Sequence, residues 1–191
     1  MARPKSEEKR AALLEAAIRV IAERGLSATP TSAISAAAGV AEGSLFTYFG
    51  TKDELVNALY LALKRELADV LLARFPRKAD VRRQFRHIWD NYVAWGVANH
   101  AKKRVLEQLN LSTQVTAASR AAGAAAFAEI EDVISARIAD GTLRRYPIAF
   151  IGASVESMAQ MTMNFMLQYP NDAARYRKAG FEVVWNGIAN G

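Results

Sequence analysis

The chain has 191 residues, of which 51% are hydrophobic and 23% charged, and its formal net charge is +6 at pH 7. No apolar run reaches the roughly 18 residues of a membrane-spanning helix, and the chain has no cysteine for disulfides or thiolate chemistry. The first residues, "MARPKSEEKRAALLEAA", lack the apolar region and cleavage site of a signal peptide. We therefore expect a cytoplasmic protein with no membrane partner.

The positive charge is unevenly distributed. Residues 56–110 hold eleven Lys and Arg against five Asp and Glu, whereas residues 1–55 and 111–191 each balance at seven of either sign. Bulk charge therefore does not mark a polyanion-binding surface near the N-terminus, and any such surface has to be found from local chemistry.

The first expected helix covers residues 7–24, where Leu14, Ile18 and Ile21 recur at the i, i+4, i+7 spacing of one helix face. Capping residues and glycines mark the ends of this helix and of the ones that follow. Ser6 is expected to cap its start and Gly25 to end it.

Thr29 and Pro30 are expected to supply the N-cap and first residue of a second helix, residues 31–38, which Gly39 ends. A third runs from about Ala41 to Phe49. The sequence Thr51-Lys52-Asp53-Glu54 opens a fourth with the pattern of a capping box.

The rest of the chain also has helical periodicity and no alternating strand pattern. The sequence predicts an all-α fold, with three short N-terminal helices joined to a larger C-terminal helical bundle. The further helical segments are expected over residues 81–99, in a short stretch after Lys102 that includes Leu106 and Leu109, and over residues 117–141, 147–170 and 172–189.

The second and third helices, joined by a tight turn at Gly39, have the layout of a helix-turn-helix, in which the second helix lies in the DNA major groove. Leu45 and Phe49 are expected to anchor this helix to its own domain. An ordinary polar surface on a three-helix corner would look similar, so the spacing alone leaves both interpretations open. Several neighbouring residues suit DNA contact through a missing side chain, small hydroxyls or a cation beside a helix N-terminus: Gly43, Ser44, Thr47, Tyr48 and Lys52.

The segment "TPTSAISAAAGVAEGSLFTYFGTKDELVNAL" resembles the N-terminal signature of tetracycline-repressor (TetR) type transcriptional regulators, over roughly residues 8–60. The resemblance implies a DNA-binding domain in residues 1–51 and a ligand-binding and dimerisation domain in residues 52–191. It also implies a homodimer that represses transcription from a palindromic double-stranded DNA operator, that a small-molecule effector releases, and that is not an enzyme.

The same resemblance assigns roles to individual residues. The expected DNA-binding residues are Thr31 and Ser32 as phosphate contacts from the second helix, Glu42, Gly43, Ser44, Phe46 and Thr47 on the recognition helix, and Tyr48 and Lys52 as a pair that clamps a phosphate.

Three residues depart from the family pattern. Ala41 stands where a capping Ser or Thr is common, which should weaken the helix start by about 0.5–2 kcal/mol. Phe46 replaces a frequent Tyr, although its ring could still meet a thymine methyl group. Glu42 either accepts a hydrogen bond from a cytosine amino group, or it interacts favourably with the positive end of the helix dipole while DNA repels it. The interaction with the dipole is favoured.

Two basic groups have alternative interpretations. Arg3, Lys5, Lys9 and Arg10 form either a DNA-contacting arm or a solvated terminus. A second cluster reads as a solvated face, with long-range steering of DNA or an anionic ligand as the alternatives: Arg74, Arg77, Lys78, Arg82, Arg83 and Arg86.

Large rings and methionines on the C-terminal helices could be core or could line the effector cavity that the family carries. We expect a mostly apolar cavity that suits a lipophilic ligand. The histidines lack acidic or Cys neighbours at metal-ligand spacing, so no metal and no cofactor is expected. The candidate effector residues are Trp89, Tyr92, Trp95, His100, Phe127, Met158, Met161 and Phe165.

The last two expected helices carry faces that must be buried against the chain or a partner. An apolar i, i+3, i+4, i+7 series lies on the final helix, and a face of small residues lies on the helix before it. The resemblance implies a four-helix dimer interface here. The candidate interface residues are Gly152, Val155, Ala159, Phe181, Val184, Trp185 and Ile188.

Two other classes of function compete with a repressor. A small helical enzyme would need a nucleophile and base pair or a metal cluster, and the sequence offers only two isolated histidines, His87 and His100. A helical adaptor that does not bind DNA would protect no palindrome in a footprinting assay.

Overall fold

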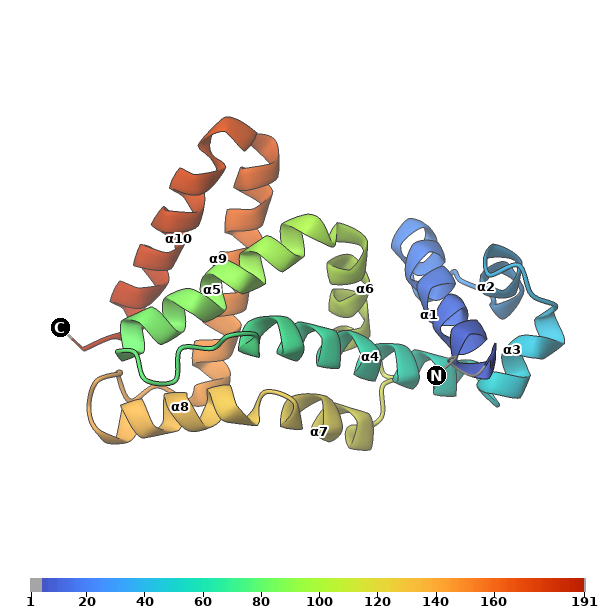
Figure 1. Ribbon diagram of the computed structural model, residues 1–191, viewed down its shortest axis with the longest axis horizontal. Helices are drawn as coiled ribbons and strands as arrows, with labels where there is room; N and C mark the ends of the chain where they lie inside the picture. Colours follow the sequence, from blue (N-terminus) through green and yellow to red (C-terminus); the bar gives the residue numbers. More distant parts are fainter. Residues whose placement is uncertain (1–4, 191) are drawn as a thin grey trace. The chain divides into compact units, whose positions relative to one another are not determined.

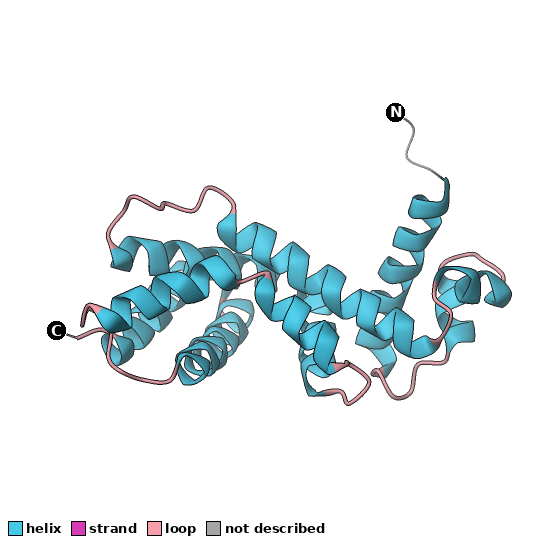
Figure 2. Ribbon diagram, turned by 90° about the horizontal axis from the view of Figure 1, so that it is seen from below, coloured by secondary structure: helices cyan, strands magenta, loops and turns pink. Residues whose placement is uncertain are grey.

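The computed structural model describes residues 5–190, and over that range every regular element is a helix (Figures 1 and 2). The predicted all-α fold is therefore confirmed. The helices are α1 (Lys5–Arg24), α2 (Thr31–Ala37), α3 (Glu42–Tyr48), α4 (Lys52–Leu72), α5 (Val81–Ala98), α6 (His100–Leu111), α7 (Ala117–Ala125), α8 (Ala128–Ala139), α9 (Ile148–Gln168), the 3₁₀ turn η1 (Pro170–Asp172) and α10 (Ala173–Ile188).

The chain divides into two compact units. The first comprises residues up to Arg65 together with Asn99–Ala124, and the second comprises Glu66–Ala98 with Ala125 and the residues after it. This division differs from the expected boundary between residues 51 and 52. The N-terminal part of α4, up to Arg65, belongs to the first unit, and so does α6, which packs on α1. The apolar face of α6 thereby becomes part of the core beneath the N-terminal helices.

Several helix starts differ from those expected. Helix α1 begins at Lys5, so Ser6 lies within the helix rather than at its cap. Pro30 occupies the cap position of α2, because the Thr29 hydroxyl donates instead to the Gly25 carbonyl oxygen at 2.7 Å. Helix α6 begins at His100, ahead of Lys102.

The expected helix stops are present, and one expected segment is broken. Gly25 and Gly39 adopt φ values of 86° and 68°, which residues with a Cβ rarely adopt, so each ends its helix. Residues 117–141 form two helices rather than one continuous segment, α7 and α8, with a break at Phe127.

The core of the first unit is mainly aliphatic and draws on α1, α2, α3, α4 and α6. The fully buried side chains include Leu13 and Ile21 from α1, Ile34 from α2 and Leu45 from α3. Burial of each such side chain contributes about 1.5–3 kcal/mol. Helices α2 and α3 have seven residues each, so this shared core rather than intrinsic helix propensity holds them. Others are Leu55, Leu59 and Leu63 from α4 and Val105 and Leu109 from α6.

The core of the second unit is built around the antiparallel pair α9 and α10 and the helix α5 that packs on both (Figure 1). Trp89 is 2% exposed, and its indole Nε1 donates to the Arg177 carbonyl oxygen at 2.9 Å. Phe181 packs beside this ring, with ring centroids 6.5 Å apart. Trp89 is therefore fixed both by packing and by its one polar atom.

Gly180 allows α10 to approach this indole closely. A Cβ at Gly180 would lie 2.2 Å from Thr162 Oγ1 and 2.7 Å from Trp89 Cζ2. Both distances are shorter than a packed interior tolerates, so the helices would have to move apart.

We expect Gly180→Ala to destabilise the protein by about 1–3 kcal/mol, because overpacking outweighs the better helix propensity of alanine. Urea unfolding followed by tryptophan fluorescence measures the change. Gly152→Ala in α9 is the control, since nothing lies within 4 Å of a Cβ there. Equal stability of the two variants would show that the Gly180 contact is not a constraint.

Candidate nucleic-acid interface

Helices α2 and α3 form a compact corner of the first unit, linked by residues 38–41. The Val40 amide donates to the Ser35 carbonyl oxygen at 3.0 Å, which closes the turn at Gly39. At the end of α2, Arg19 from α1 donates through Nη2 to the Ala37 carbonyl oxygen at 3.0 Å. The turn is thus held by backbone bonds and by a cation at the negative end of α2.

Two apolar side chains fasten α3 to the unit, as the sequence predicts. Leu45 is fully buried and Phe49, directly after the helix, is 3% exposed. The Arg10 guanidinium lies over the Phe49 ring, 5.0 Å from its centroid. Because Leu45 and Phe49 are four residues apart, they fix one face of α3 and direct the other face outward.

The outward side of α3 carries small hydroxyls and one ring. Ser44 and Tyr48 are half-buried, whereas Gly43 and Thr47 are exposed and Phe46 is 44% exposed. The Thr47 hydroxyl donates to the Gly43 carbonyl oxygen at 3.3 Å, so it is occupied by its own helix in the free protein. Ala41 is the N-cap residue and makes no side-chain cap bond, as expected from its lack of a polar atom.

Glu42 makes a contact that the sequence did not indicate. Thr31, the first residue of α2, donates its hydroxyl to Glu42 Oε1 at 3.3 Å, so the starts of the two helices are joined. Between Thr31 and Tyr48 the carboxylate of Glu42 is the only charged side chain. Ser32, beside Thr31, is exposed.

The start of α4 combines a cap with a cation. The Glu54 amide donates to Thr51 Oγ1 at 3.1 Å, which confirms Thr51 as the N-cap. The Glu54 carboxylate accepts from the Gly50 amide at 3.0 Å, one residue before the bond that a standard capping box makes. Half-buried Lys52 therefore lies in a well-defined first turn, beside amides suited to a phosphate.

A network of hydrogen bonds within the first unit stabilises the first turns of α4. Asn57 of α4 donates to the carbonyl oxygens of Asp53 and Gln114 and accepts from the Thr116 amide, all within 2.9 Å. The Gln114 side chain donates to Asp53 Oδ1 at 2.8 Å. The loop after α6 thereby holds the N-terminal end of α4.

Tyr60, further along α4, lies against α7. A Cβ at Gly123 would lie 2.8 Å from its ring. Burial raises the pKa of the Tyr60 phenol above its ordinary value, and the positive charge of Arg120 opposes that shift.

The N-terminal basic residues fall on α1 or before it. Arg3 lies outside the described residues, and Lys5 begins α1. Lys9 and Arg10 are exposed on the first turns, with Arg10 engaged over Phe49.

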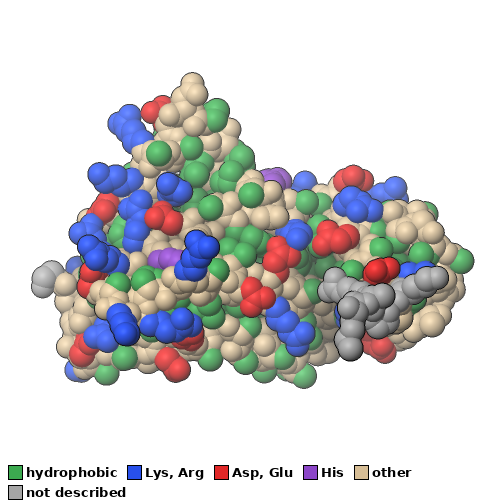
Figure 3. Space-filling view, in the orientation of Figure 1, with side chains coloured by type: hydrophobic (Ala, Val, Ile, Leu, Met, Phe, Trp, Pro, Cys, Tyr) green, Lys and Arg blue, Asp and Glu red, His purple; other side chains and the backbone are tan. Residues whose placement is uncertain are grey.

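The basic cluster of residues 74–86 is largely paired. Arg77 bonds Glu129, Arg82 bonds Glu182 and Arg86 bonds Asp90, at distances from 2.6 to 2.8 Å. Arg83 lies 3.5 Å from Asp80. Basic side chains accordingly stand among acidic ones in Figure 3 rather than forming one basic patch. This pairing favours the solvated-face interpretation over an anionic-ligand site.

The candidate effector residues do not meet around one cavity. Trp89 and Trp95 are buried with their indoles bonded to the Arg177 carbonyl and to Glu66, and His100 belongs to the other unit. Tyr92, Phe127 and Met158 are half-buried, whereas Met161 is 48% and Phe165 39% exposed. Within residues 5–190, no three His, Cys, Asp or Glu side chains gather as a metal site.

The candidate dimer residues are mostly covered by the chain itself. Ala159, Phe181, Val184 and Ile188 belong to the core cluster, with Val155 and Trp185 packed against it, so only Gly152 is exposed. The apolar stripe of α10 that the sequence singles out faces inward, toward α5 and α9.

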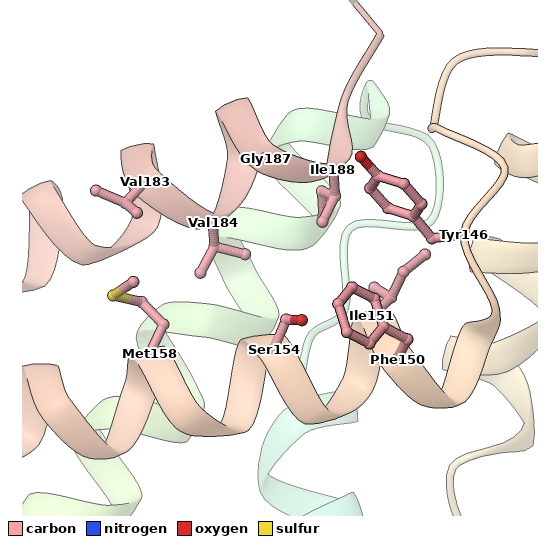
Figure 4. A pocket seen from close by; sticks show the side chains of 9 residues that line it. All are labelled: Tyr146, Phe150, Ile151, Ser154, Met158, Val183, Val184, Gly187 and Ile188. Atoms are coloured by element: carbon pink, nitrogen blue, oxygen red, sulfur yellow. The ribbon is translucent and has the colours of Figure 1, made fainter.

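A different apolar face of the same two helices remains open to solvent. A groove of about 280 Å³ runs between α9 and α10 (Figure 4). Phe150 and Val183 on its rims are 59% and 57% exposed. Periodicity shows that a helix has an apolar face but not which of two faces the chain covers, so this groove could not be assigned beforehand. Its lining is Tyr146, Phe150, Ile151, Ser154, Met158, Val183, Val184, Gly187 and Ile188.

Residues 13–59 match the family model described as bacterial regulatory proteins, tetR family. These residues contain the anchored α3, the turn at Gly39 and the capped start of α4. The domain that these residues form belongs to the tetR family. Its predicted resemblance is thus confirmed.

Curated relatives match part of the chain. An 81-residue segment is 41% identical to the HTH-type transcriptional repressor Rv3405c of Mycobacterium tuberculosis, covering 42% of this chain and 43% of the relative. A 67-residue segment is 42% identical to the HTH-type transcriptional repressor KstR2 of the same species, covering 35% of this chain and 32% of that one. The matches thus span less than half the length of these relatives.

Solved structures extend the similarity along the chain. A tetR-family structure from a Shewanella species is 27% identical, with a TM-score of 0.86 over 96% of this chain and 99% of its own. A TetR family transcription regulator from Marinobacter aquaeolei is 23% identical, with a TM-score of 0.90 over the full length of both chains. The C-terminal bundle therefore shares the tetR fold, although its sequence is far less similar.

No helix within residues 5–190 combines the length and the apolar character needed to cross a bilayer.

Proposed function

We propose that this tetR-family protein is a cytoplasmic transcriptional repressor that binds a palindromic DNA operator as a homodimer. The observation that carries the proposal is the row of hydroxyls on the outward side of α3, one exposed and two half-buried, within the segment that the family model matches. Buried Leu45 and Phe49 hold this side outward. In a helix-turn-helix, such a face enters the major groove.

The DNA contacts divide by chemistry. Thr31, Ser32, Tyr48 and Lys52 are proposed to hold phosphates, because hydroxyls and a cation at helix starts suit anionic oxygens. Their positions at the starts of α2 and α4 and at the end of α3 surround the recognition face. The proposed base-reading residues lie on the outward side of α3: Glu42, Gly43, Ser44, Phe46 and Thr47.

A second copy of the chain is the proposed occupant of the groove between α9 and α10. An exposed apolar groove of this kind is typical of an interaction surface, and exposed Met161 and Phe165 continue the apolar surface along α9. A two-fold interface between identical faces gives two recognition helices, which match a palindrome when they lie about 34–36 Å apart. The proposed interface thus adds exposed Phe150 and Val183 to Val184 and Ile188, which also line the groove, and leaves out buried Phe181.

A small lipophilic effector is proposed to bind in the second unit. Tyr92 supports this, because it is only half-buried and packs against the apolar core, where an apolar ligand gains most. Such a ligand releases DNA only if it binds the non-DNA-binding conformation more tightly than the other.

We expect Tyr48→Phe and Lys52→Ala each to weaken binding to every operator variant by a similar factor, because they remove phosphate contacts. Lys52→Ala should also reduce the salt dependence of binding, because it removes a cation, whereas Tyr48→Phe should leave it unchanged. Ser44→Ala and Thr47→Ala should instead change which base pairs are preferred, at about 1–3 kcal/mol per position. Fluorescence anisotropy with labelled duplexes at fixed salt measures both effects.

Lys178→Ala on α10 is the matched control for loss of a cation, because Lys178 is exposed on the other unit. A uniform loss of affinity from both sets of variants would contradict the division into phosphate and base contacts. Failure of the wild-type protein to bind any palindrome would overturn the repressor proposal.

We expect Val183→Asp and Phe150→Asp to convert the dimer to monomers, because each places an unpaired charge in an apolar interface. Sedimentation velocity measures the change, and tryptophan fluorescence confirms that the variants stay folded. Leu111→Asp is the control, since Leu111 is 88% exposed on α6 of the first unit and the dimer should persist. Unchanged dimerisation of both groove variants would exclude this interface.

We expect an apolar ligand to quench the fluorescence of Trp89 or Trp95 saturably and to release bound DNA over the same concentration range. Decanoic acid and an anilinonaphthalene sulfonate dye are suitable first probes. Tyr92→Ala should weaken the effect severalfold, because the ring borders the proposed site. Quenching with unchanged DNA affinity would show that the ligand is not an effector.

A further inference from the structure

The recognition corner is unusual in its charge. Residues 31–48, which contain α2, the turn and α3, carry no Lys or Arg and a single carboxylate, that of Glu42. Glu42 is exposed at the first position of α3, the end that reaches base edges in a helix-turn-helix. A negative charge at that position opposes binding to any phosphate backbone.

The structure adds that Glu42 already has a hydrogen-bond donor. Thr31 Oγ1 donates to Glu42 Oε1 at 3.3 Å. A hydroxyl has one proton to donate, so Thr31 cannot serve Glu42 and a phosphate oxygen at once. Binding that uses Thr31 as a phosphate contact therefore takes the donor away from Glu42.

The donor that replaces it has to come from the DNA. An ionised carboxylate only accepts hydrogen bonds, and phosphate oxygens offer it none. In the major groove, cytosine presents an amino group without an acceptor beside it on the same base, whereas adenine pairs its amino group with the N7 acceptor. Cytosine is therefore the base whose major-groove edge best supplies a hydrogen-bond donor to the Glu42 carboxylate.

We propose that Glu42 is a specificity-determining residue that selects a cytosine in each half-site and rejects DNA lacking one. This inference rests on the proposed function and extends it. On a matching site, the Thr31 proton goes to a phosphate and the cytosine amino group donates to Glu42. On other DNA, either Thr31 stays with Glu42 and the phosphate contact is lost, or the carboxylate remains unpaired beside phosphates.

Selection from a library of palindromes with randomised half-sites tests the proposal with the full-length chain. We expect wild-type protein to enrich a C·G pair at one symmetric position of each half-site. Glu42→Gln should lose that preference while keeping the others, because the neutral amide both donates and accepts and so no longer demands a donor from the base edge. Its affinity for non-specific DNA should rise about fivefold, and the wild-type discrimination of about tenfold at this position should fall to nearly one.

Two further variants separate the effect of the Glu42 contact from the effect of removing a negative charge. Glu23→Gln removes one exposed carboxylate of the same unit from α1, outside the recognition corner, and should select the wild-type sites. Thr31→Val removes the hydroxyl but keeps the branched shape, so it should weaken all binding and leave the cytosine preference intact. A Glu42→Gln selection identical to that of the wild type would overturn the inference.

The result also separates this inference from the function on which it rests. If wild-type protein enriches no palindrome, the repressor proposal itself fails. If it enriches palindromes without a conserved C·G pair that depends on Glu42, the repressor proposal stands and the role of Glu42 is overturned.

Discussion

Burial of Leu45 and Phe49 is the constraint on which the candidate DNA interface depends. Helix α3 has seven residues, far fewer than an isolated helix needs to be stable in water, and its N-cap Ala41 provides no side-chain bond. Its orientation is therefore set by two apolar side chains held in the core of the first unit. Because Leu45 and Phe49 point into the core, the opposite side of α3, with Ser44, Thr47 and Tyr48, is turned wholly or partly toward solvent.

A second constraint shapes the C-terminal bundle. The contact of Gly180 with Trp89 brings α10 close to α5 and turns the apolar stripe of α10 inward. What remains on the outer side is a shallower apolar groove between α9 and α10, bordered by Phe150 and Val183. The bundle thus covers one apolar face of α10 itself and leaves the groove, which is the proposed dimer face, open to solvent.

The charge of the recognition corner favours selectivity over affinity. Residues 1–55 carry no net charge, and residues 31–48 contain only the Glu42 carboxylate. Non-specific DNA binding depends mainly on cations at phosphates, so such a surface gains little on arbitrary DNA. Most of its binding energy has to come from contacts that only a correct site completes.

The sequence by itself determined the helical class, most helix ends, the anchors of α3 and the tetR resemblance, because these depend on periodicity, caps and local spacing. Tertiary structure decided that Trp89, Trp95 and Phe181 are core, that α6 joins the N-terminal unit, and that Thr31 reaches Glu42. Amphipathic periodicity identifies an apolar face but not the surface it packs against. Contacts between residues far apart in the chain exist only once the helices are assembled.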